Sequence, residues 1–254
     1  MRECPDRPCA IGTTTIPAGP AAPRSKRRCT PVRNIIGGVF LTLDGVMQGP
    51  GGPTEDVTGG FVDGGWVFKL WDEAVGSAIG SLFAGEYDLL LGRRTYDIFA
   101  AYWPYVEGEG AAMGKAFTRT NKYVLTRGNQ SLAWANSHRM KSIDDVAALK
   151  QEDGPDLIIQ GSSTIYPGLL GAGLIDRLLL MTFPVTLGKG KRLFGGGTPA
   201  AMLKMVDHKV TAKGTVIATY EPGGTLPAFP PFGPQPSTST REAERQRQMA
   251  VGSW

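Results

Sequence analysis

Short apolar runs separated by turn-forming residues dominate the middle of the chain and predict β-strands. The first run, residues 34–43, ends at the turn dipeptide Asp44-Gly45. Two last runs, residues 202–210 and 215–220, predict an antiparallel hairpin. Runs of the same kind predict strands between these ends, at residues 87–91, 122–126, 156–160 and 175–182.

Between the strands, apolar residues recur with the period of an α-helix. Ser142 is a favourable N-cap, with Asp145 three residues later, for a helix that continues to Lys150. Apolar residues three or four positions apart predict a helix over residues 66–83: Phe68, Trp71, Val75, Ile79 and Leu82. Further helices are expected at residues 96–102, 113–118 and 164–170, and an irregular loop at residues 48–60.

Strands that alternate with helices predict the fold class. Right-handed βαβ crossovers give an α/β protein of three layers, in which a mostly parallel central sheet lies between helices. The C-terminal hairpin adds antiparallel strands. Ligands of such sheets bind beyond the carboxyl ends of the strands, where the helices begin, so we look for a site there.

Composition separates a folded middle from two tails. The 254 residues are 41% hydrophobic, which is enough for one sizeable core, and no apolar run approaches the ~18 residues of a membrane span. A net charge of +5 on residues 1–33 and +1 on residues 224–254 leaves −2 for residues 34–223, out of +4 in total. The mildly acidic middle argues against a nucleic-acid-binding face, and we expect no nucleic-acid partner.

Eleven of the 19 prolines lie in the same two tails. We therefore predict disorder over residues 1–33 and 224–254, with a short charged helix possible at residues 240–249, around one domain at residues 34–223. All three cysteines, Cys4, Cys9 and Cys29, fall in the first tail without zinc-ligand spacing, so no metal site is expected. The tail has no apolar stretch typical of a secretory signal, and we expect a cytoplasmic protein; an alternative is that translation starts at Val32.

Three strand ends carry residues suited to an anionic ligand. The first is Gly92-Arg93-Arg94-Thr95, where a glycine admits a close backbone approach, a helix begins, and two guanidinium groups favour phosphate. The second is Thr126-Arg127, and the third is Gly161-Ser162-Ser163-Thr164. Each alone is more often a turn or a helix cap, but three at successive strand ends predict one pocket for a polyanion. The chain has no Gly-x-Gly-x-x-Gly and no Walker A pattern.

The order of these motifs resembles the dihydrofolate reductase-like superfamily, in particular the branch that contains the reductase domain of bacterial riboflavin biosynthesis. The most specific match is a Gly-Leu-Ile-Asp turn at residues 173–176, which leads through a strand to Pro-Val-Thr-Leu-Gly-Lys-Gly at residues 184–190. The resemblance covers about residues 33–222, and its other stretches are residues 41–45, 91–96, 125–127 and 160–163. Riboflavin enzymes usually carry a lysine in the first strand, where this chain has Gly38-Val39-Phe40-Leu41.

The resemblance implies an NADPH-dependent reductase and assigns its cofactor contacts. Gly92, Arg93, Arg94 and Thr95 would hold the cofactor phosphates, and Thr126 and Arg127 would lie beside the adenosine 2′-phosphate. Gly161, Ser162, Ser163 and Thr164 would cradle the pyrophosphate. Thr42 and Leu43, with Asp44, would lie against the nicotinamide. The arginines favour NADPH over NADH, because a 2′-phosphate needs a positive partner.

Reduction of a C=N bond in a heterocycle also needs a proton on nitrogen, which a carboxyl group with a raised pKa can deliver. Asp44 is the first candidate by its position, although Asp-Gly is also a common turn. Asp63 is the second, because dihydrofolate reductases place an acid near the first helix. We predict structural roles for the aromatic residues Trp66, Phe68 and Trp71, because such side chains more often belong to the core than to a substrate pocket.

The resemblance implies a small pyrimidine- or pteridine-like substrate, as in 5-amino-6-(5-phosphoribosylamino)uracil reductase or dihydrofolate reductase. The alternative is a nucleotide-binding protein without turnover, for instance a stress-linked protein of the same fold. A homodimer is a further expectation, since riboflavin-branch reductases resemble symmetric dimers. A weaker idea is that the basic N-terminal tail binds nucleic acid.

Overall fold

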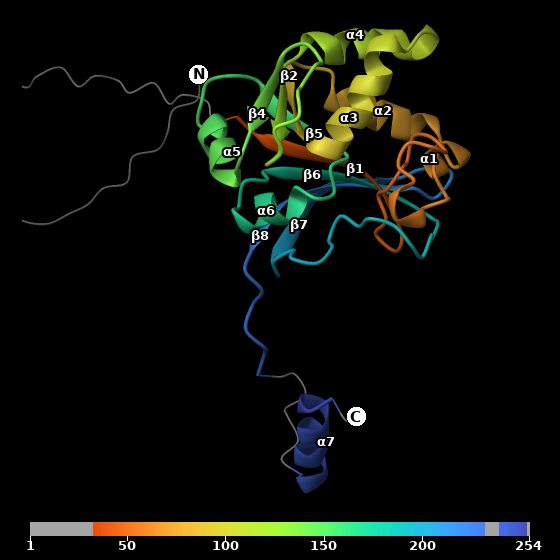
Figure 1. Ribbon diagram of the computed structural model, residues 1–254. Coiled ribbons are helices and arrows are strands. Elements are labelled where there is room, and N and C mark those ends of the chain that lie inside the picture. The colour runs from red at the N-terminus through yellow and green to blue at the C-terminus, as the bar shows by residue number, and fades with distance from the viewer. Residues whose placement is uncertain (1–32, 232–238, 253–254) are drawn as a thin grey trace, which may run out of the picture. The chain divides into compact units, whose positions relative to one another are not determined.

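The computed structural model describes residues 33–231 and 239–252. The cysteines, Val32 and all but the last residue of the predicted N-terminal tail lie outside these ranges. Within them, the central feature is an eight-stranded sheet in the order β4-β3-β2-β5-β1-β6-β8-β7 (Figure 1). The strands are β1 (Ile35–Thr42), β2 (Tyr87–Gly92), β3 (Lys122–Leu125), β4 (Ser137–Met140), β5 (Asp156–Gln160), β6 (Arg177–Phe183), β7 (Met202–Val210) and β8 (Val216–Gly224).

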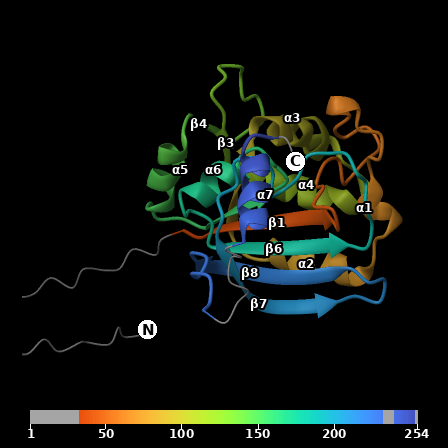
Figure 2. The ribbon, with the colours of Figure 1, turned by 90° about the horizontal axis from the view of Figure 1, so that it is seen from below.

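The six strands from β4 to β6 are parallel to their neighbours, whereas β8 pairs antiparallel with both β6 and β7. Figure 2 shows β1, β6, β8 and β7 side by side. The mostly parallel sheet and its antiparallel C-terminal hairpin agree with the fold class predicted from the sequence. The described helices are α1 (Trp66–Lys69), α2 (Glu73–Leu82), α3 (Arg93–Tyr102), α4 (Ala111–Arg119), α5 (Ile143–Lys150), α6 (Tyr166–Gly171) and α7 (Thr240–Ala250).

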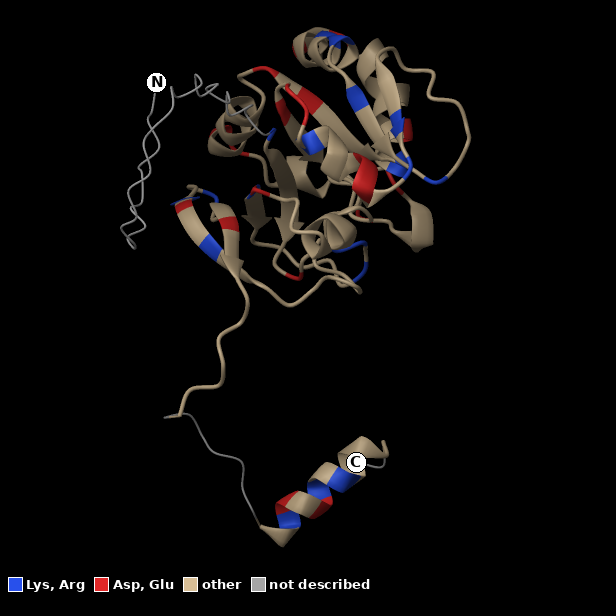
Figure 3. Ribbon diagram, turned by 90° about the vertical axis from the view of Figure 1, so that its left-hand side faces the viewer, with Lys and Arg blue, Asp and Glu red and all other residues tan. Residues whose placement is uncertain are grey.

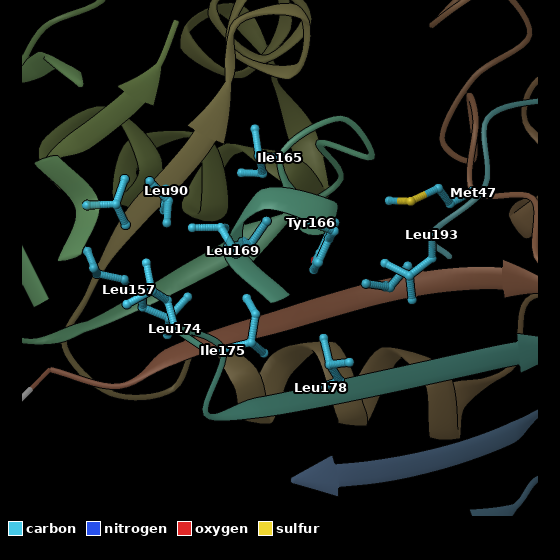
Figure 4. Close-up of a cluster of buried hydrophobic side chains, with 14 of the residues drawn as sticks. Met47, Leu90, Leu157, Ile165, Tyr166, Leu169, Leu174, Ile175, Leu178 and Leu193 are labelled. Carbon is cyan, nitrogen blue, oxygen red and sulfur yellow. The ribbon is translucent and has the colours of Figure 1, made fainter. Parts of the chain in front are cut away.

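Helices cover both faces of the sheet because its central strands are apolar on both sides. One cluster of buried residues joins α5 and α6 to strands β1, β5 and β6, and Figure 4 shows labelled members of it. Two further clusters join α1 and α2, and α3 and α4, to the opposite face. Successive side chains of β1 point to opposite faces of the sheet and so contribute to the clusters on both faces. Ile35 and Val39 belong to the first cluster, while Ile36 and Phe40 pack into the others.

Two glycines in β1 let helices approach the sheet closely. A Cβ atom added to Gly37 would lie 2.7 Å from the Tyr166 hydroxyl oxygen of α6, and one added to Gly38 would collide with Leu82 of α2. The Tyr166 side chain is fully buried. The Gly37-Gly38 pair therefore sets how tightly the helices of both layers pack on the middle of the sheet.

The helix predicted over residues 66–83 is wrong in one respect, because it is broken between α1 and α2. Asp72 has extended backbone angles (φ −137°, ψ 166°), and its side chain accepts a hydrogen bond from the Val75 N–H. This N-cap starts a new helix and turns the chain. The apolar rhythm continues through the break, which is why the periodicity alone predicts a single helix.

Strand β4 is not predicted by the sequence pattern. Its four residues have no alternation of apolar and polar side chains, and none of them is fully buried. It forms the edge of the sheet, where it pairs only with β3. An edge strand held by backbone hydrogen bonds leaves little hydrophobic pattern in the sequence.

The N-terminal boundary of the domain lies before Arg33, and the prediction that this residue belongs to the disordered tail is wrong. The Arg33 side chain is only 2% exposed and forms an ion pair with the buried Asp88 of β2. Its Nε donates to the Pro155 carbonyl at 2.7 Å, and its guanidinium carbon lies 5.3 Å from the centre of the Tyr123 ring. Arg33 is thus part of the core.

The C-terminal segment predicted to be disordered contains two ordered parts. Strand β8 continues to Gly224, and residues 240–250 form α7, whose N-cap Ser239 accepts a hydrogen bond from the Glu242 N–H. Figure 3 shows acidic and basic residues in bands along α7. Among the described residues, no helix has both the length and the apolar character to cross a membrane.

We expect Arg33→Met to lower the free energy of unfolding by about 3 kcal/mol, because it leaves the Asp88 carboxylate buried without its cation. Arg177→Met is the matched control, since Arg177 pairs with Glu221 on the surface, at 50% and 40% side-chain exposure. That change should cost less than about 1 kcal/mol. Urea denaturation measures both, and equal effects would contradict the structural role of Arg33.

Candidate functional site

A cleft of about 1050 Å³ lies at the carboxyl ends of the central strands. Its lining includes Gly92 at the end of β2, the segment 160–164 after β5, and Phe40 of β1. Residues of the loop 47–56, of α1 to α4, and Lys191 complete it. The cleft therefore lies where ligands of parallel α/β sheets bind.

Two of the three strand ends predicted to bind an anion, residues 92–95 and residues 161–164, are joined in this cleft. Leu89 of β2 pairs with Ile158 of β5, so that Gly92 and Gly161 both leave the sheet three residues later. The Gly92 N–H donates to Ser162 Oγ at 2.8 Å, and the Ser162 N–H donates to Thr95 Oγ1 at 2.9 Å. These two hydrogen bonds hold the start of α3 against the segment after β5.

The backbone of Gly161 and Ser162 is left-handed, with φ values of +75° and +64°. Glycine adopts this conformation readily, and a Cβ at Gly161 would also lie 3.2 Å from the Thr95 side chain. The same conformation costs a serine about 1 kcal/mol, so its two hydrogen bonds must keep the turn in place. The Ser162 hydroxyl oxygen accepts the first of these bonds, its own O–H can still donate, and its predicted contact with a ligand stays a prediction.

Three other predicted residues line the cleft with side chains that are open to a ligand. The side chains of Arg94, Ser163 and Thr164 make no hydrogen bond or ion pair to another residue in the described part of the chain. Helix α3 begins at Arg93 without a side-chain cap, so its first N–H groups also remain available. A cation, two hydroxyls and helix N–H groups at one end of a cleft suit an anion.

Arg93 does not line the cleft, although it neighbours Arg94. Its Nε lies 2.9 Å from both carboxylate oxygens of Asp97, and its Nη1 donates to the Gln130 carbonyl at 3.0 Å. Arg93 therefore holds the loop after β3 in place. Of the two arginines, only Arg94 belongs to the described cleft lining, and phosphate binding by either one stays a prediction.

The remaining predicted strand end, Thr126-Arg127, lies beside the cleft and does not line it. Leu125 of β3 pairs with Gly92, so the two residues that follow it stand next to the start of α3. Thr126 Oγ1 accepts from the Gly128 N–H at 3.2 Å, whereas Arg127 is exposed. Of these two residues, Arg127 remains open to an external anion.

Asp44 supports the turn after β1 and does not line the cleft. Its carboxylate accepts hydrogen bonds from the Thr42 hydroxyl at 2.5 Å, the Gly188 N–H at 2.8 Å and the Leu187 N–H at 3.2 Å. The Thr42 hydroxyl is the first cause that holds the pKa of Asp44 below its usual value. An ionised carboxylate with these partners is a poor proton donor, so the predicted catalytic role is replaced by a structural one.

The other predicted residues near this turn also lie apart from the cleft lining. Thr42 is buried and accepts from the Val46 N–H, so its hydroxyl belongs to the same turn. Leu43 is 66% exposed, and Asp63 is partly exposed before α1. None of these residues reaches the cleft, and the structure does not support the nicotinamide and catalytic roles predicted for them.

Glu55 is an acid of the cleft that the sequence pattern does not single out. It lines the cleft, and one of its oxygens accepts hydrogen bonds from the Gly51 N–H at 2.5 Å and the Gly52 N–H at 3.2 Å. Burial raises the pKa of Glu55 above its usual value, although these two hydrogen bonds oppose the shift. Its loop lacks periodicity, and only the run of Gly and Pro before it indicates a tight turn that could present a side chain.

Phe40, Phe68 and Trp71 form a second part of the cleft lining, which is called its aromatic end. Phe68 and Trp71 are stacked, with ring centres 5.3 Å apart and planes 21° apart, and Phe40 lies edge-on to Trp71 at 6.4 Å. The prediction that these rings are core holds for Trp66, which is buried, but Phe68 is 62% exposed and lines the cleft. Flat rings in a cleft whose lining also includes the acid Glu55 suit a planar heterocycle.

Comparison with known proteins yields a family model, a curated relative and solved structures of similar fold. The family model described as the RibD C-terminal domain matches residues 33–218. A curated relative, the uncharacterized protein YyaP of Bacillus subtilis (strain 168), is 28% identical over 204 residues, which cover 76% of this chain and 96% of that protein.

Similar chains also occur among solved structures. A Shewanella sp. PV-4 protein named for riboflavin biosynthesis aligns with a TM-score of 0.56 and 20% identity, over 74% of this chain and 98% of that one. Enterococcus faecalis dihydrofolate reductase, solved with NADP(H), aligns with a TM-score of 0.48 and 15% identity, over 75% and 96%. The likeness to the Shewanella protein confirms the predicted α/β fold.

Substitutions of Ser162 test the lock between β2 and β5, by which we mean the two hydrogen bonds that join Gly92, Ser162 and Thr95. Ser162→Ala should lower the free energy of unfolding by about 1–2 kcal/mol, because the Gly92 N–H loses its acceptor while the left-handed backbone remains. Ser162→Gly loses the same acceptor but relieves the backbone strain, so it should be more stable than the alanine variant. Chemical denaturation compares the two, and an alanine variant as stable as wild type would refute the lock.

Proposed function

The chain belongs to the RibD C-terminal domain family, and from this membership and the cleft we propose that it is an NADPH-dependent reductase of a pyrimidine- or pteridine-like heterocycle. The observation that carries the proposal is the joined pair of strand ends, at which Arg94 and bare backbone face a cleft with aromatic walls. One end of this cleft suits an anion and the other suits a flat ring. A cofactor and a substrate that meet in hydride transfer need this combination.

The residues at the anionic end fit a dinucleotide. Gly92 and Gly161 present backbone without side chains, and Arg94, Ser163 and Thr164 would bind the pyrophosphate. Arg127, exposed at the end of the neighbouring strand β3, would bind the 2′-phosphate that distinguishes NADPH from NADH. Ser162 and Thr95 would act indirectly, since their hydrogen bonds position this backbone.

Bound NADPH supplies a hydride from its nicotinamide ring, and the protein must orient the substrate and provide a proton. Phe68 and Trp71 would hold the substrate ring by stacking and keep water away from it. Glu55, whose pKa is raised above its usual value by burial, would donate the proton to the substrate nitrogen. The described cleft offers this role to Glu55 more readily than to Asp56, which is paired with Lys191.

Titration with NADPH, followed by cofactor fluorescence, tests the binding half of the proposal. Arg94→Ala should weaken NADPH binding at least about tenfold, because it removes the cation that this end of the cleft offers. Arg127→Ala should weaken NADPH but leave NADH unchanged. Arg119→Ala, an exposed arginine outside the cleft lining, is the control. No binding at sub-millimolar NADPH would defeat the proposal, and binding without oxidation by any heterocycle would favour the nucleotide-binding alternative.

Glu55→Gln tests the proton donor. The change should lower kcat by about 100-fold while the Kd for NADPH stays the same, because an amide cannot donate the proton. In the wild type, kcat should fall as the pH rises through the raised pKa of Glu55, since only the protonated carboxyl is active.

The variant should lose that pH dependence. Glu86→Gln, which changes an exposed carboxylate outside the cleft lining, serves as the control. A pH profile that is unchanged in Glu55→Gln would assign the proton to another group.

A further inference from the structure

We propose that the substrate bound at the aromatic end of this cleft is an uncharged planar ring system without a phosphate group. The inference rests on the proposed function, because it specifies the second ligand of the same cleft. It departs from the phosphoribosyl substrate that the riboflavin branch implies. Four features of the cleft lead to it: the face of α2, the aromatic walls, the distribution of charge, and a buried amide oxygen without a partner among the described residues.

Helix α2 faces the cleft with two glycines, at positions where larger side chains would occupy part of the cleft. Gly76, Ile79, Gly80 and Phe83 are spaced by three or four positions, and all of them line the cleft. A Cβ added at Gly80 would meet no atom within 4 Å. Each glycine inside a helix costs about 1 kcal/mol relative to alanine, so the helix loses stability while it leaves this space open.

The shape of this space suits a ring. A Cβ added at Gly76 would lie 3.2 Å from the indole of Trp71, so the glycine lets that ring lie close against the helix. Phe68 stacks on Trp71, and Phe40 stands edge-on to it. Flat apolar surfaces bind planar ligands by stacking, and they give no favourable contact to a hydrated anion.

Among the described residues, the lining offers no free cation at the aromatic end. Lys191 is bonded to the Asp56 carboxylate and, at 2.6 Å, to Thr58 Oγ1. Arg94, the other cation of the lining, follows Gly92 at the anionic end. Within the lining, a phosphate beside the aromatic walls would therefore find no free cation, whereas an uncharged ring needs none.

The polar groups that remain suit a neutral heterocycle. The Gln160 side-chain oxygen is buried at the cleft wall and has no hydrogen-bond partner among the described residues. An amide that lacks a partner can pair with the N–H or C=O edge of a pyrimidine-type ring, and Glu55 can pair with a second group. Both would recognise the ring itself.

Riboflavin and its 5′-phosphate, FMN, test this inference, because they share a benzo-fused pteridine ring and differ only in the phosphate. Their binding is measured without NADPH, by the quenching of flavin fluorescence, in the full chain carrying Arg94→Ala, whose anionic end has lost its cation. We expect FMN to bind at least about tenfold more weakly than riboflavin, since its phosphate would lose hydration without gaining a cation. Equal affinity, tighter binding of FMN, or no binding of riboflavin would overturn the inference.

Two variants locate the binding. Gly80→Leu should abolish riboflavin binding because its side chain fills the open space, whereas Gly80→Ala should retain it and serve as the control for helix stability. Asp56→Asn frees Lys191, so it should raise the affinity for FMN relative to riboflavin several-fold. Riboflavin binding that survives Gly80→Leu, or an unchanged ratio in Asp56→Asn, would contradict the proposed position and charge argument.

The result is independent of the test of the proposed function. If NADPH fails to bind while riboflavin binds in a Gly80-dependent way, the reductase proposal fails and the ring-binding end of the cleft stands. If NADPH binds as expected but FMN binds as well as riboflavin, the reductase proposal stands and this inference fails.

Discussion

The mutual lock between the ends of β2 and β5 is the constraint on which the cleft depends. Parallel pairing brings Gly92 and Gly161 to one edge, but pairing alone would leave the two chain segments free to diverge. The hydrogen bonds through Ser162 and Thr95 prevent this divergence. They also explain why a serine occupies a left-handed position that favours glycine. Its hydroxyl oxygen accepts the hydrogen bond of the Gly92 N–H, which glycine could not do. Backbone order at this point gives the cleft its shape before any ligand arrives.

Much of the fold could be predicted because it is encoded locally. Strand β5 has the predicted bounds of residues 156–160, and the capping box of Ser142 and Asp145 starts α5 as expected. The failures have a common cause. The cap at Asp72 breaks an apolar rhythm that continues across it, and β4 is held by its neighbour β3 instead of by its own pattern. Tertiary pairing decides both, and a single sequence does not contain it.

The site could be predicted at the level of segments but not of individual side chains. Successive residues of a helix point about 100° apart, so Arg93 turns to Asp97 and Gln130 while Arg94 lines the cleft. A motif that names both arginines cannot separate them. Glu55 escapes prediction for the opposite reason, because its position depends on how an irregular loop folds back over the sheet. The acid that the pattern favours, Asp44, serves a turn whose partner segment lies more than 140 residues away in sequence.

The buried pair of Arg33 and Asp88 has a consequence for how the domain is delimited. Asp88 also accepts hydrogen bonds from the backbone and side-chain N–H groups of Asn121, so one carboxylate connects the entry of the chain with β2 and the start of β3. A chain that began at residue 34 would retain every strand and helix yet lack the counter-ion of a carboxylate sealed in the interior. The shortest autonomous version of this domain is therefore determined by electrostatic neutrality inside the fold, two residues before its first strand begins.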